Sequence, residues 1–99
     1  EVYRAILAAV NDFDGRLGSG KISQILAGSK TAAIAEKKLH LNRHFGKLEL
    51  YSQTNLMARI QELEDNHYLN RVQRGMFPCL EVAAKGHEVL ANHAQVVIK

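Results

Sequence analysis

The sequence predicts a mainly α-helical domain closed by a small two-stranded β-hairpin. Apolar residues recur at three- and four-residue spacing over the first two thirds of the chain. From Tyr68 the pattern becomes partly alternating, and a glycine–proline turn divides it into two short runs. A helical cluster closed by such a ribbon is the winged-helix variant of the helix-turn-helix. At 99 residues and 11.0 kDa, residues 1–99 are expected to form one domain.

Periodic apolar residues and capping residues mark the first two helices. A helix is predicted over Glu1–Phe13, and the turn-forming run Asp12–Gly15 ends it. Gly15 and Gly18 are expected to keep the following loop loose, and Ser19 to cap a second helix over 20–27. The inward-facing residues of the two helices are Val2, Ile6, Val10, Phe13, Ile22, Ile25 and Leu26.

A shorter helix and an irregular connection come next. Gly28 is expected to end the second helix, and Ser29 to cap a short helix over Lys30–Lys38. The segment His40–Leu50 has no clear period and is predicted to be a connecting loop. Its expected apolar anchors are Leu41, Phe45, Leu48 and Leu50.

The most regular helix follows Ser52, which is expected to cap it, and ends at Asn66–His67. Its buried stripe is formed by Leu56, Ile60 and Leu63.

The last third of the chain predicts the hairpin and a closing helix. Two strands, Tyr68–Gln73 and Cys79–Ala83, flank a predicted turn over Arg74–Pro78. A final helix is predicted over Ala84–Ala94. Because an isolated hairpin is marginally stable, this one must lean on the helices. The expected contacts are Leu69, Leu80 and Val82 from the strands, and Val89 and Leu90 from the helix.

Charge is distributed unevenly along the chain. The net charge is +3, but residues 16–47 hold seven basic residues against one acidic residue, Glu36, which is 7 − 1 = +6. The rest of the chain therefore carries 3 − 6 = −3. This asymmetry favours a surface that binds a polyanion, the alternative being a basic face without a partner.

Motifs for catalysis and metal binding are weak. The run Gly15–Ile22 nearly matches a phosphate-binding loop, but Ile22 replaces the hydroxyl residue and a helix precedes it, so ATP binding is not expected. His40 and His44 lack further metal ligands nearby and are interpreted as a DNA-facing or solvated pair. Cys79 is the single cysteine, which excludes internal disulfides, and is expected to be buried. No catalytic pattern is evident, so this chain is not expected to be an enzyme.

Neither a membrane nor a secreted location is expected, because the chain has no apolar run of about 18 residues and no signal peptide. It begins at Glu1 and ends in Val96–Lys99, so we expect it to be a fragment of a longer protein.

The predicted hairpin tip is unusual for a turn. Met76 and Phe77 are large and apolar, and Arg71 and Arg74 flank them. In one hypothesis Phe77 folds back as a satellite core residue. In the other, the apolar tip wedges against a base pair while the arginines hold phosphates.

Five landmarks in order resemble the RQC winged-helix domain of RecQ-family DNA helicases. They are Leu26–Lys30, Phe45–Gly46, Ile60–Leu69, Arg74–Leu80 and Lys85–Gly86. The resemblance covers nearly the whole chain, and the arginine-glycine-x-aromatic-proline tip is similar to that of bacterial members.

The resemblance implies DNA binding in the service of a helicase. In such helicases two motor lobes hydrolyse ATP with Mg²⁺, a four-cysteine module holds zinc, and the hairpin wing parts the strands. Those activities and cofactors are expected in the parent protein rather than in this chain. The implied partners are double-stranded or forked DNA and motor lobes in the same chain. The implied location is the cytoplasm, with the nucleoid. The implied processes are DNA repair, recombination and replication.

Site residues are predicted from the basic segment and from the resemblance, which matches Gly28–Ser29 to a phosphate-contacting pair at a helix start. The sequence departs from some relatives at Ala33, where a DNA-contacting arginine can stand. The predicted backbone-binding residues are Arg16, Lys21, Gly28, Ser29, Lys30, Lys37, Lys38, Arg43 and Lys47. The predicted strand-separating wing is Arg71, Arg74, Gly75, Met76, Phe77 and Pro78. No catalytic or metal-binding residue is predicted.

Two alternatives remain open. A sequence-specific winged-helix regulator would read base edges with Gln53, Asn55, Arg59 and Gln61. A protein-interaction winged helix would use the apolar tip as a docking knob.

Overall fold

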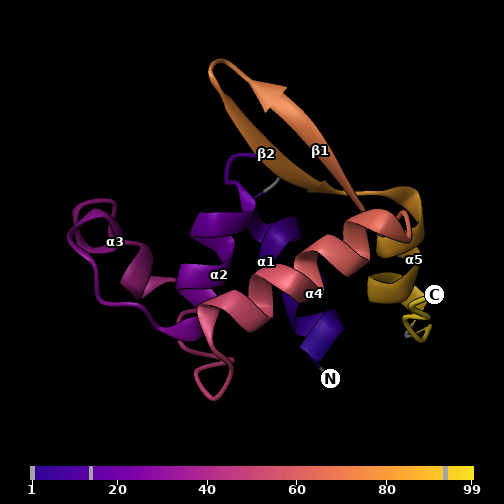
Figure 1. Cartoon of the computed structure of the whole chain (residues 1–99), viewed down its shortest axis with the longest axis horizontal. Helices are drawn as coiled ribbons and strands as arrows, with labels where there is room; N and C mark the ends of the chain where they lie inside the picture. Colours follow the sequence, from indigo (N-terminus) through magenta and orange to yellow (C-terminus); the bar gives the residue numbers. More distant parts are fainter. Residues whose placement is uncertain (1, 14, 93) are drawn as a thin grey trace.

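The computed structural model describes residues 2–13, 15–92 and 94–99. Its elements, in order, are α1 (Val2–Phe13), α2 (Ser19–Ala27), α3 (Ala32–Glu36), a 3₁₀ helix η1 (Leu39–Leu41), α4 (Gln53–Asp65), β1 (Leu69–Arg74), β2 (Phe77–Val82) and α5 (Ala84–Asn92). Figure 1 shows the hairpin projecting from a helical cluster, with α3 at one end and α5 at the other. The predicted element order is confirmed. The predicted helix start at Glu1, Asp14 in the first stop signal and His93 in the last helix lie outside the described residues.

The core is formed by α1, α2 and α4 together with the base of the hairpin. The predicted inward faces are confirmed, except that Val2 and Leu90 are only partly buried. The residues that fix the hairpin to the helices, Leu69, Leu80 and Val82, are buried as expected.

Two predicted helix caps are wrong and one is confirmed. Ser19 is the first residue of α2, and Gly18 precedes it without a side-chain cap. Thr31 caps α3, with its hydroxyl oxygen accepting from the Ile34 amide at 3.3 Å. Ser29 cannot serve as that cap because it belongs to the end of α2, where its amide donates to the Gln24 carbonyl at 2.9 Å. Ser52 caps α4 as predicted, accepting from the Asn55 amide at 3.0 Å.

The connection from α3 to α4 is held mainly by its backbone. The Gly46 and Leu48 amides donate to the carbonyls of Ile25 and Leu26 at 2.8 and 2.9 Å. The bond from Leu48 satisfies a carbonyl that the end of α2 would otherwise leave unpaired, whereas the Ile25 carbonyl also accepts from the Gly28 amide at 3.1 Å. Phe45 and Leu48 pack on the core as predicted. Leu41 and Leu50 do not, being 72% and 95% exposed, because the backbone bonds hold the segment without them.

The hairpin is tighter than predicted. The register pairs Leu69 with Val82 and Arg74 with Phe77, so only Gly75 and Met76 form the turn. Gly75 has φ +62°, which glycine supplies without steric cost. The predicted turn over 74–78 is therefore wrong at both ends, because these residues continue the strand ladder.

The loop between α1 and α2 packs against the hairpin instead of being loose. The Leu80 amide donates to the Leu17 carbonyl at 2.8 Å, beyond the edge of β2 that faces away from β1. A side chain at Gly18 would come within 2.7 Å of the Pro78 carbonyl oxygen, so glycine permits this approach. Pro78 lies two residues before Leu80, so the backbone N positions of both face away from β1. The missing N–H of Pro78 therefore removes no hydrogen bond between the two strands, and proline is tolerated in β2.

The chain closes with α5, which ends at Asn92, short of the predicted Ala94. The segment beyond it returns to the core, where the Val97 amide donates to the Tyr68 hydroxyl at 2.9 Å. Among the described residues, no helix combines the length and apolar character needed to cross a membrane.

Candidate nucleic-acid interface

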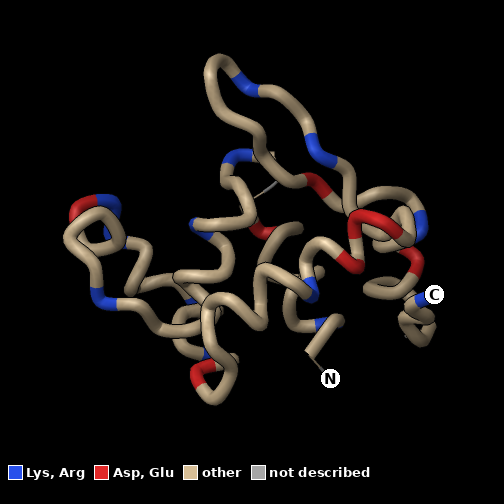
Figure 2. The backbone as a smooth tube through the Cα atoms, viewed as in Figure 1, with Lys and Arg blue, Asp and Glu red and all other residues tan. Residues whose placement is uncertain are grey.

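A basic groove lies between the hairpin, the α1–α2 loop and the start of α2. It has a volume of about 450 Å³. Four of its lining side chains are cationic, and none of the described lining residues is acidic. Figure 2 shows Lys and Arg positions on these elements, whereas several acidic positions gather near the end of α4 and on α5. The groove is lined by Arg16, Leu17, Gly18, Lys21, Lys37, Arg74, Phe77, Pro78 and Cys79.

The two arginines of the groove are oriented by backbone carbonyls. The Arg16 Nε donates to the Phe13 carbonyl at 2.8 Å, and the Arg74 Nε donates to the Gly15 carbonyl at 2.9 Å. The Arg16 Nη2 also donates to the Asp12 carbonyl at 3.3 Å, and each guanidinium keeps further N–H groups beyond those used here. Lys21 and Lys37 form no salt bridge within the described part of the chain, so their charges are not cancelled by a nearby carboxylate.

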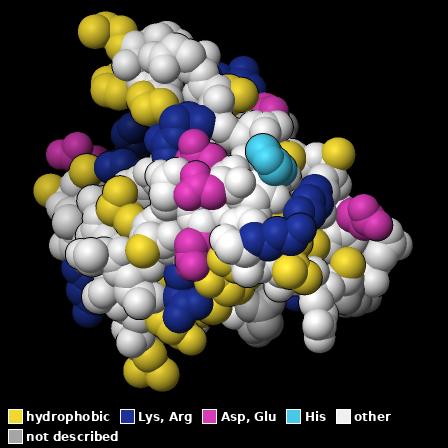
Figure 3. All heavy atoms as spheres, turned by 45° about the vertical axis from the view of Figure 1, so that its right-hand side comes forward, with side chains coloured by type: hydrophobic (Ala, Val, Ile, Leu, Met, Phe, Trp, Pro, Cys, Tyr) yellow, Lys and Arg dark blue, Asp and Glu magenta, His cyan; other side chains and the backbone are white. Residues whose placement is uncertain are grey.

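The hairpin tip is strongly apolar and exposed. Met76 and Phe77 are 88% and 71% exposed, and Figure 3 shows hydrophobic side chains at the outer end of the hairpin with basic side chains beneath them. The hypothesis that Phe77 is a satellite core residue is therefore wrong. Its position explains this: it begins β2 opposite Arg74, far from the core contacts made by Leu80 and Val82.

Arg71 braces the hairpin against α4. Its Nε and Nη2 atoms donate to the Glu64 carboxylate, the shortest distance being 2.7 Å from Nη2 to Oε1. The hydrogen bonds that Arg71 donates to Glu64 are the main reason why the pKa of the Arg71 guanidinium is raised. Arg71 was predicted to hold phosphate, and the guanidinium N–H groups that Glu64 does not use are the ones left for such a contact.

Arg43 is also paired within the chain. Its Nε and Nη2 both donate to the Asp12 carboxylate at 2.8 Å. This interaction is the main reason why the pKa of Asp12 is lowered, with a smaller lowering from His44 opposed by burial. Asp12 therefore offsets one of the charges counted in the basic segment.

The interpretation of His40 and His44 as one exposed pair is wrong. His40 is exposed on η1, which ends at Leu41, so the two rings do not share a helix face. His44 is 3% exposed, and its Nε2 lies 2.6 Å from the Asp12 Oδ2. Because it is buried against α1, His44 cannot face DNA.

The other predicted contacts are dispersed. Gly28–Ser29 lies at the end of α2, not at a helix start, and its amides donate to Ile25 and Gln24, so the unpaired N–H groups expected for a phosphate are not present. A phosphate contact there would have to use the Ser29 hydroxyl. Lys30 lines a separate apolar pocket, and Lys38 precedes η1 as its N-cap residue in an exposed position. Lys47 lies beside α1 and α5, in a depression apart from the groove.

Sequence reasoning missed three groove residues and the role of one loop. Leu17, Gly18 and Cys79 line the groove, and Gly15 orients Arg74 through its carbonyl. The repeated glycines of the loop were the available signal, since glycine often marks a close backbone approach. Cys79 is buried, as predicted. No cluster of three or more His, Cys, Asp or Glu side chains suited to a metal ion occurs among the described residues.

The helical cluster, the hairpin and the basic groove beneath an apolar tip define a winged-helix domain of the nucleic-acid-binding kind. The whole chain, residues 1–99, matches the family described as the RQC domain, so the chain belongs to the RQC domain family. No curated protein matches the chain. RQC domains are DNA-binding domains of RecQ helicases, so the expected resemblance to this domain is confirmed and DNA is the partner it indicates.

Proposed function

We propose that this chain is the DNA-gripping accessory domain of a RecQ-like, ATP-dependent helicase of the bacterial type. It would hold backbone phosphates at a fork or duplex end and help to separate the strands with its hairpin. The observation that carries this proposal is the exposed apolar tip, Met76 and Phe77, directly above a groove with four cationic side chains.

The chemistry of the two parts is complementary. Cations that contact phosphates hold a duplex without reading its sequence. An aromatic ring such as Phe77 can stack on a base that has lost its partner, which contributes about 1–3 kcal/mol per base. Together they favour the open end of a duplex over its interior.

Helix α4 supports this proposal over a sequence-specific regulator. Its single cation, Arg59, lies over the rings of Tyr3 and Tyr51 at 5.4 and 5.2 Å and donates to the Asn55 side chain at 2.8 Å. The helix also contains Glu62, Glu64 and Asp65, which gives it a net charge of 1 − 3 = −2. Such a helix would be repelled by the phosphates that border a major groove.

Catalysis is assigned to the rest of the parent protein. We propose that ATP, Mg²⁺ and zinc are bound by motor lobes and a zinc module in the same longer chain, and that this domain contributes no catalytic residue. DNA as a partner is also the reason for proposing a nucleoid-associated, cytoplasmic location and a part in replication, recombination or repair.

The decisive experiment compares unwinding with ATP hydrolysis in the parent helicase. Phe77→Ala and Met76→Ala should each lower the unwinding rate by about tenfold while ATP hydrolysis changes little, because the lost ring stacking of Phe77, or the lost apolar wedge of Met76, acts on the strands and not on the motor. Leu50→Ala is the matched control, since Leu50 is a highly exposed apolar residue away from the hairpin. Equal loss of both activities would contradict the wedge. Failure of this chain to bind blunt or forked duplex at low salt would favour the protein-interaction alternative.

A further inference from the structure

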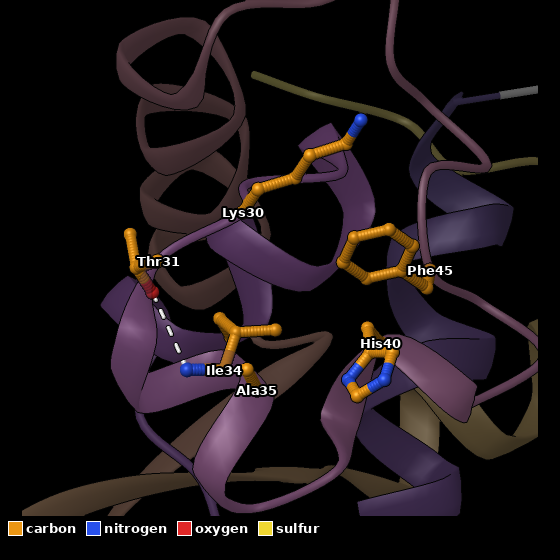
Figure 4. A pocket seen from close by; sticks show the side chains of 6 residues that line it. All are labelled: Lys30, Thr31, Ile34, Ala35, His40 and Phe45. Atoms are coloured by element: carbon orange, nitrogen blue, oxygen red, sulfur yellow. Dashed lines mark hydrogen bonds between the residues drawn. The ribbon is translucent and has the colours of Figure 1, made fainter.

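A second pocket, separate from the basic groove, lies between α3, η1 and the connecting segment. It has a volume of about 280 Å³ and shares no lining residue with the groove. Figure 4 shows its lining residues, which come from both sides of the α3–η1 turn. They are Lys30, Thr31, Ile34, Ala35, His40 and Phe45.

The walls of this pocket are suited to a flat ring. The rings of His40 and Phe45 meet edge to face, with 6.5 Å between centroids and 82° between planes. Ile34 is buried, whereas Ala35 is exposed at the surface of α3. The hydroxyl oxygen of Thr31 accepts from the Ile34 amide, which holds this group at the start of α3 and leaves its O–H as a donor. The pocket therefore offers apolar and aromatic surface with little hydrogen-bonding capacity.

The surroundings of the pocket are cationic. Lys30 stands at its rim, and in Figure 4 its amino group extends away from the apolar interior. Lys37 and Lys38 follow directly after α3, and Glu36 is the single acid between residues 30 and 47. An apolar, aromatic interior with a basic rim complements a ligand that joins an aromatic ring to an anion. A nucleotide has this chemistry, whereas an uncharged apolar side chain of a partner would gain nothing from the rim.

We propose that this pocket receives one unpaired base of single-stranded DNA, which stacks on the Phe45 ring and lies against the His40 ring at a steep angle, while Lys30 holds the adjoining phosphate. The inference rests on the proposed DNA-binding function. A base inside a duplex is already stacked and paired, so the ligand must be a nucleotide from a single-stranded arm. Because the interior presents little hydrogen-bonding capacity, the pocket accepts purines and pyrimidines alike.

Binding of single-stranded oligonucleotides by this 99-residue chain tests the proposal. A thymidine pentanucleotide should bind about fivefold more tightly than an abasic pentamer with the same phosphates, because base stacking is lost in the latter. The NMR signals of the His40 ring should shift with the thymidine pentamer and not with the abasic one.

Filling the pocket should abolish the preference for bases. Ala35→Phe places a ring at an exposed position that lines the pocket, and Ala32→Phe is the matched control on an exposed face of the same helix outside it. We expect the fivefold preference to disappear in Ala35→Phe and to persist in Ala32→Phe, with circular dichroism spectra unchanged in both. His40→Ala, at an exposed side chain, provides a second variant and should lower the preference without perturbing the core.

The results separate this proposal from the function on which it rests. Equal affinity of the wild-type chain for the two pentamers would contradict the proposal that the pocket binds a base. NMR shifts confined to the basic groove would contradict it as well. If the chain still bound blunt duplex, the proposed DNA-binding function would stand. If the wild-type chain bound neither duplex nor single-stranded DNA at low salt, both the pocket proposal and the proposed function would be contradicted.

Discussion

Asp12 connects two parts of the chain that lie far apart in sequence. Its carboxylate binds the Arg43 guanidinium at the surface and the buried His44 ring, both of which belong to the connection between α3 and α4. The Nδ1 atom of His44 has no hydrogen-bond partner among the described residues, so Asp12 supplies the single polar side-chain contact seen for that ring. This carboxylate therefore adds a side-chain anchor to a connecting segment that backbone bonds to the end of α2 also hold.

Removing the carboxylate should destabilise the fold in a pH-dependent manner. Asp12→Ala leaves the Nε2 atom of His44 buried without its partner, which should lower the free energy of unfolding at pH 7 by about 1–3 kcal/mol. The pKa of Asp12 is lowered in the folded protein, mainly by Arg43, from an unfolded value near 3.8. Its stabilisation is therefore present above pH 3.8 and is lost as the pH falls through the folded-state pKa. Urea unfolding of wild type and variant from pH 7 to pH 2 should show the difference narrowing below pH 3.8.

The control for this experiment is Asp65→Ala, which removes an exposed carboxylate of α4 that accepts from Gln61. It should change the free energy of unfolding at pH 7 by less than about 0.5 kcal/mol. A constant difference between wild type and Asp12→Ala down to pH 2 would show that Asp12 acts through packing and not through its charge.

Gly86 marks the closest approach between α5 and the base of the hairpin. A Cβ added there would collide with the Tyr68 carbonyl oxygen and come within 2.7 Å of the Val82 Cγ1. Gly86→Ala should therefore lower the free energy of unfolding by about 1–3 kcal/mol. Gly20→Ala is the opposite case, because Gly20 lies in α2 and nothing lies within 4 Å of the added Cβ. This substitution should raise the free energy of unfolding by about 0.5–1 kcal/mol. Urea unfolding should show a decrease in the free energy of unfolding for Gly86→Ala and an increase for Gly20→Ala. Destabilisation by both substitutions would contradict this explanation.

The residue-scale contacts were the least accessible to sequence reasoning. His40 and His44 suggested a local pair because their spacing fits a helix, but the backbone ends η1 at Leu41. The true partner of His44 lies 32 residues away. Periodicity reports on neighbours along one element and carries no information about such a contact.

At the scale of elements, the groove depends on the contact between the hairpin and the α1–α2 loop. Leu17 extends the hydrogen bonding of β2 beyond its outer edge, and Gly15 fixes the Arg74 side chain. The start of α2 then brings Lys21 beside the hairpin. A charged segment and a hairpin predicted separately from the sequence thus become a single surface.

Lys21 should contribute one phosphate contact to DNA binding. For wild type, the logarithm of duplex affinity should fall linearly with the logarithm of salt concentration, because binding releases counterions. Lys21→Ala should reduce the magnitude of that slope by about 0.9. Lys85→Ala is the matched control, because Lys85 lies over the Tyr68 ring away from the groove and should leave the slope unchanged. Equal effects of both variants would show that the domain attracts DNA by net charge alone.

Element types were predictable where a pattern was long, and boundaries failed where backbone bonding decided them. The stripe of Leu56, Ile60 and Leu63 identified α4 together with its cap at Ser52. The hairpin turn was predicted too wide because Phe77 and Pro78 resemble turn residues by type, although both continue the ladder. The predicted cap at Ser29 was wrong for the same kind of reason. Gly28 adopts a left-handed conformation, which directs the Ser29 amide to the Gln24 carbonyl at the end of α2.

At the scale of the whole molecule, charge separates basic surfaces, which suit DNA phosphates, from an acidic surface, which does not. The basic groove and the rim of the second pocket both belong to residues 16–47 or to the hairpin, whereas α4 carries a net negative charge. Under the proposed function, the wing and the α1–α2 loop would contact the phosphates, and α4 would not read bases as it would in a sequence-specific regulator. Arg59 of α4 instead lies over the rings of Tyr3 and Tyr51, and this cluster fixes α4 to α1.

This arrangement predicts binding that is indifferent to duplex sequence. The dissociation constants of this chain for blunt duplexes of unrelated sequence, at equal length and salt, should agree within about threefold, because phosphate contacts carry no sequence information. A regulator that reads base edges would instead spread them by at least about 1,000-fold. Gln61→Ala, which removes a side chain such a regulator would use, should leave each of these constants unchanged. A strong preference for one duplex that Gln61→Ala abolishes would contradict the proposed function and identify α4 as a recognition helix.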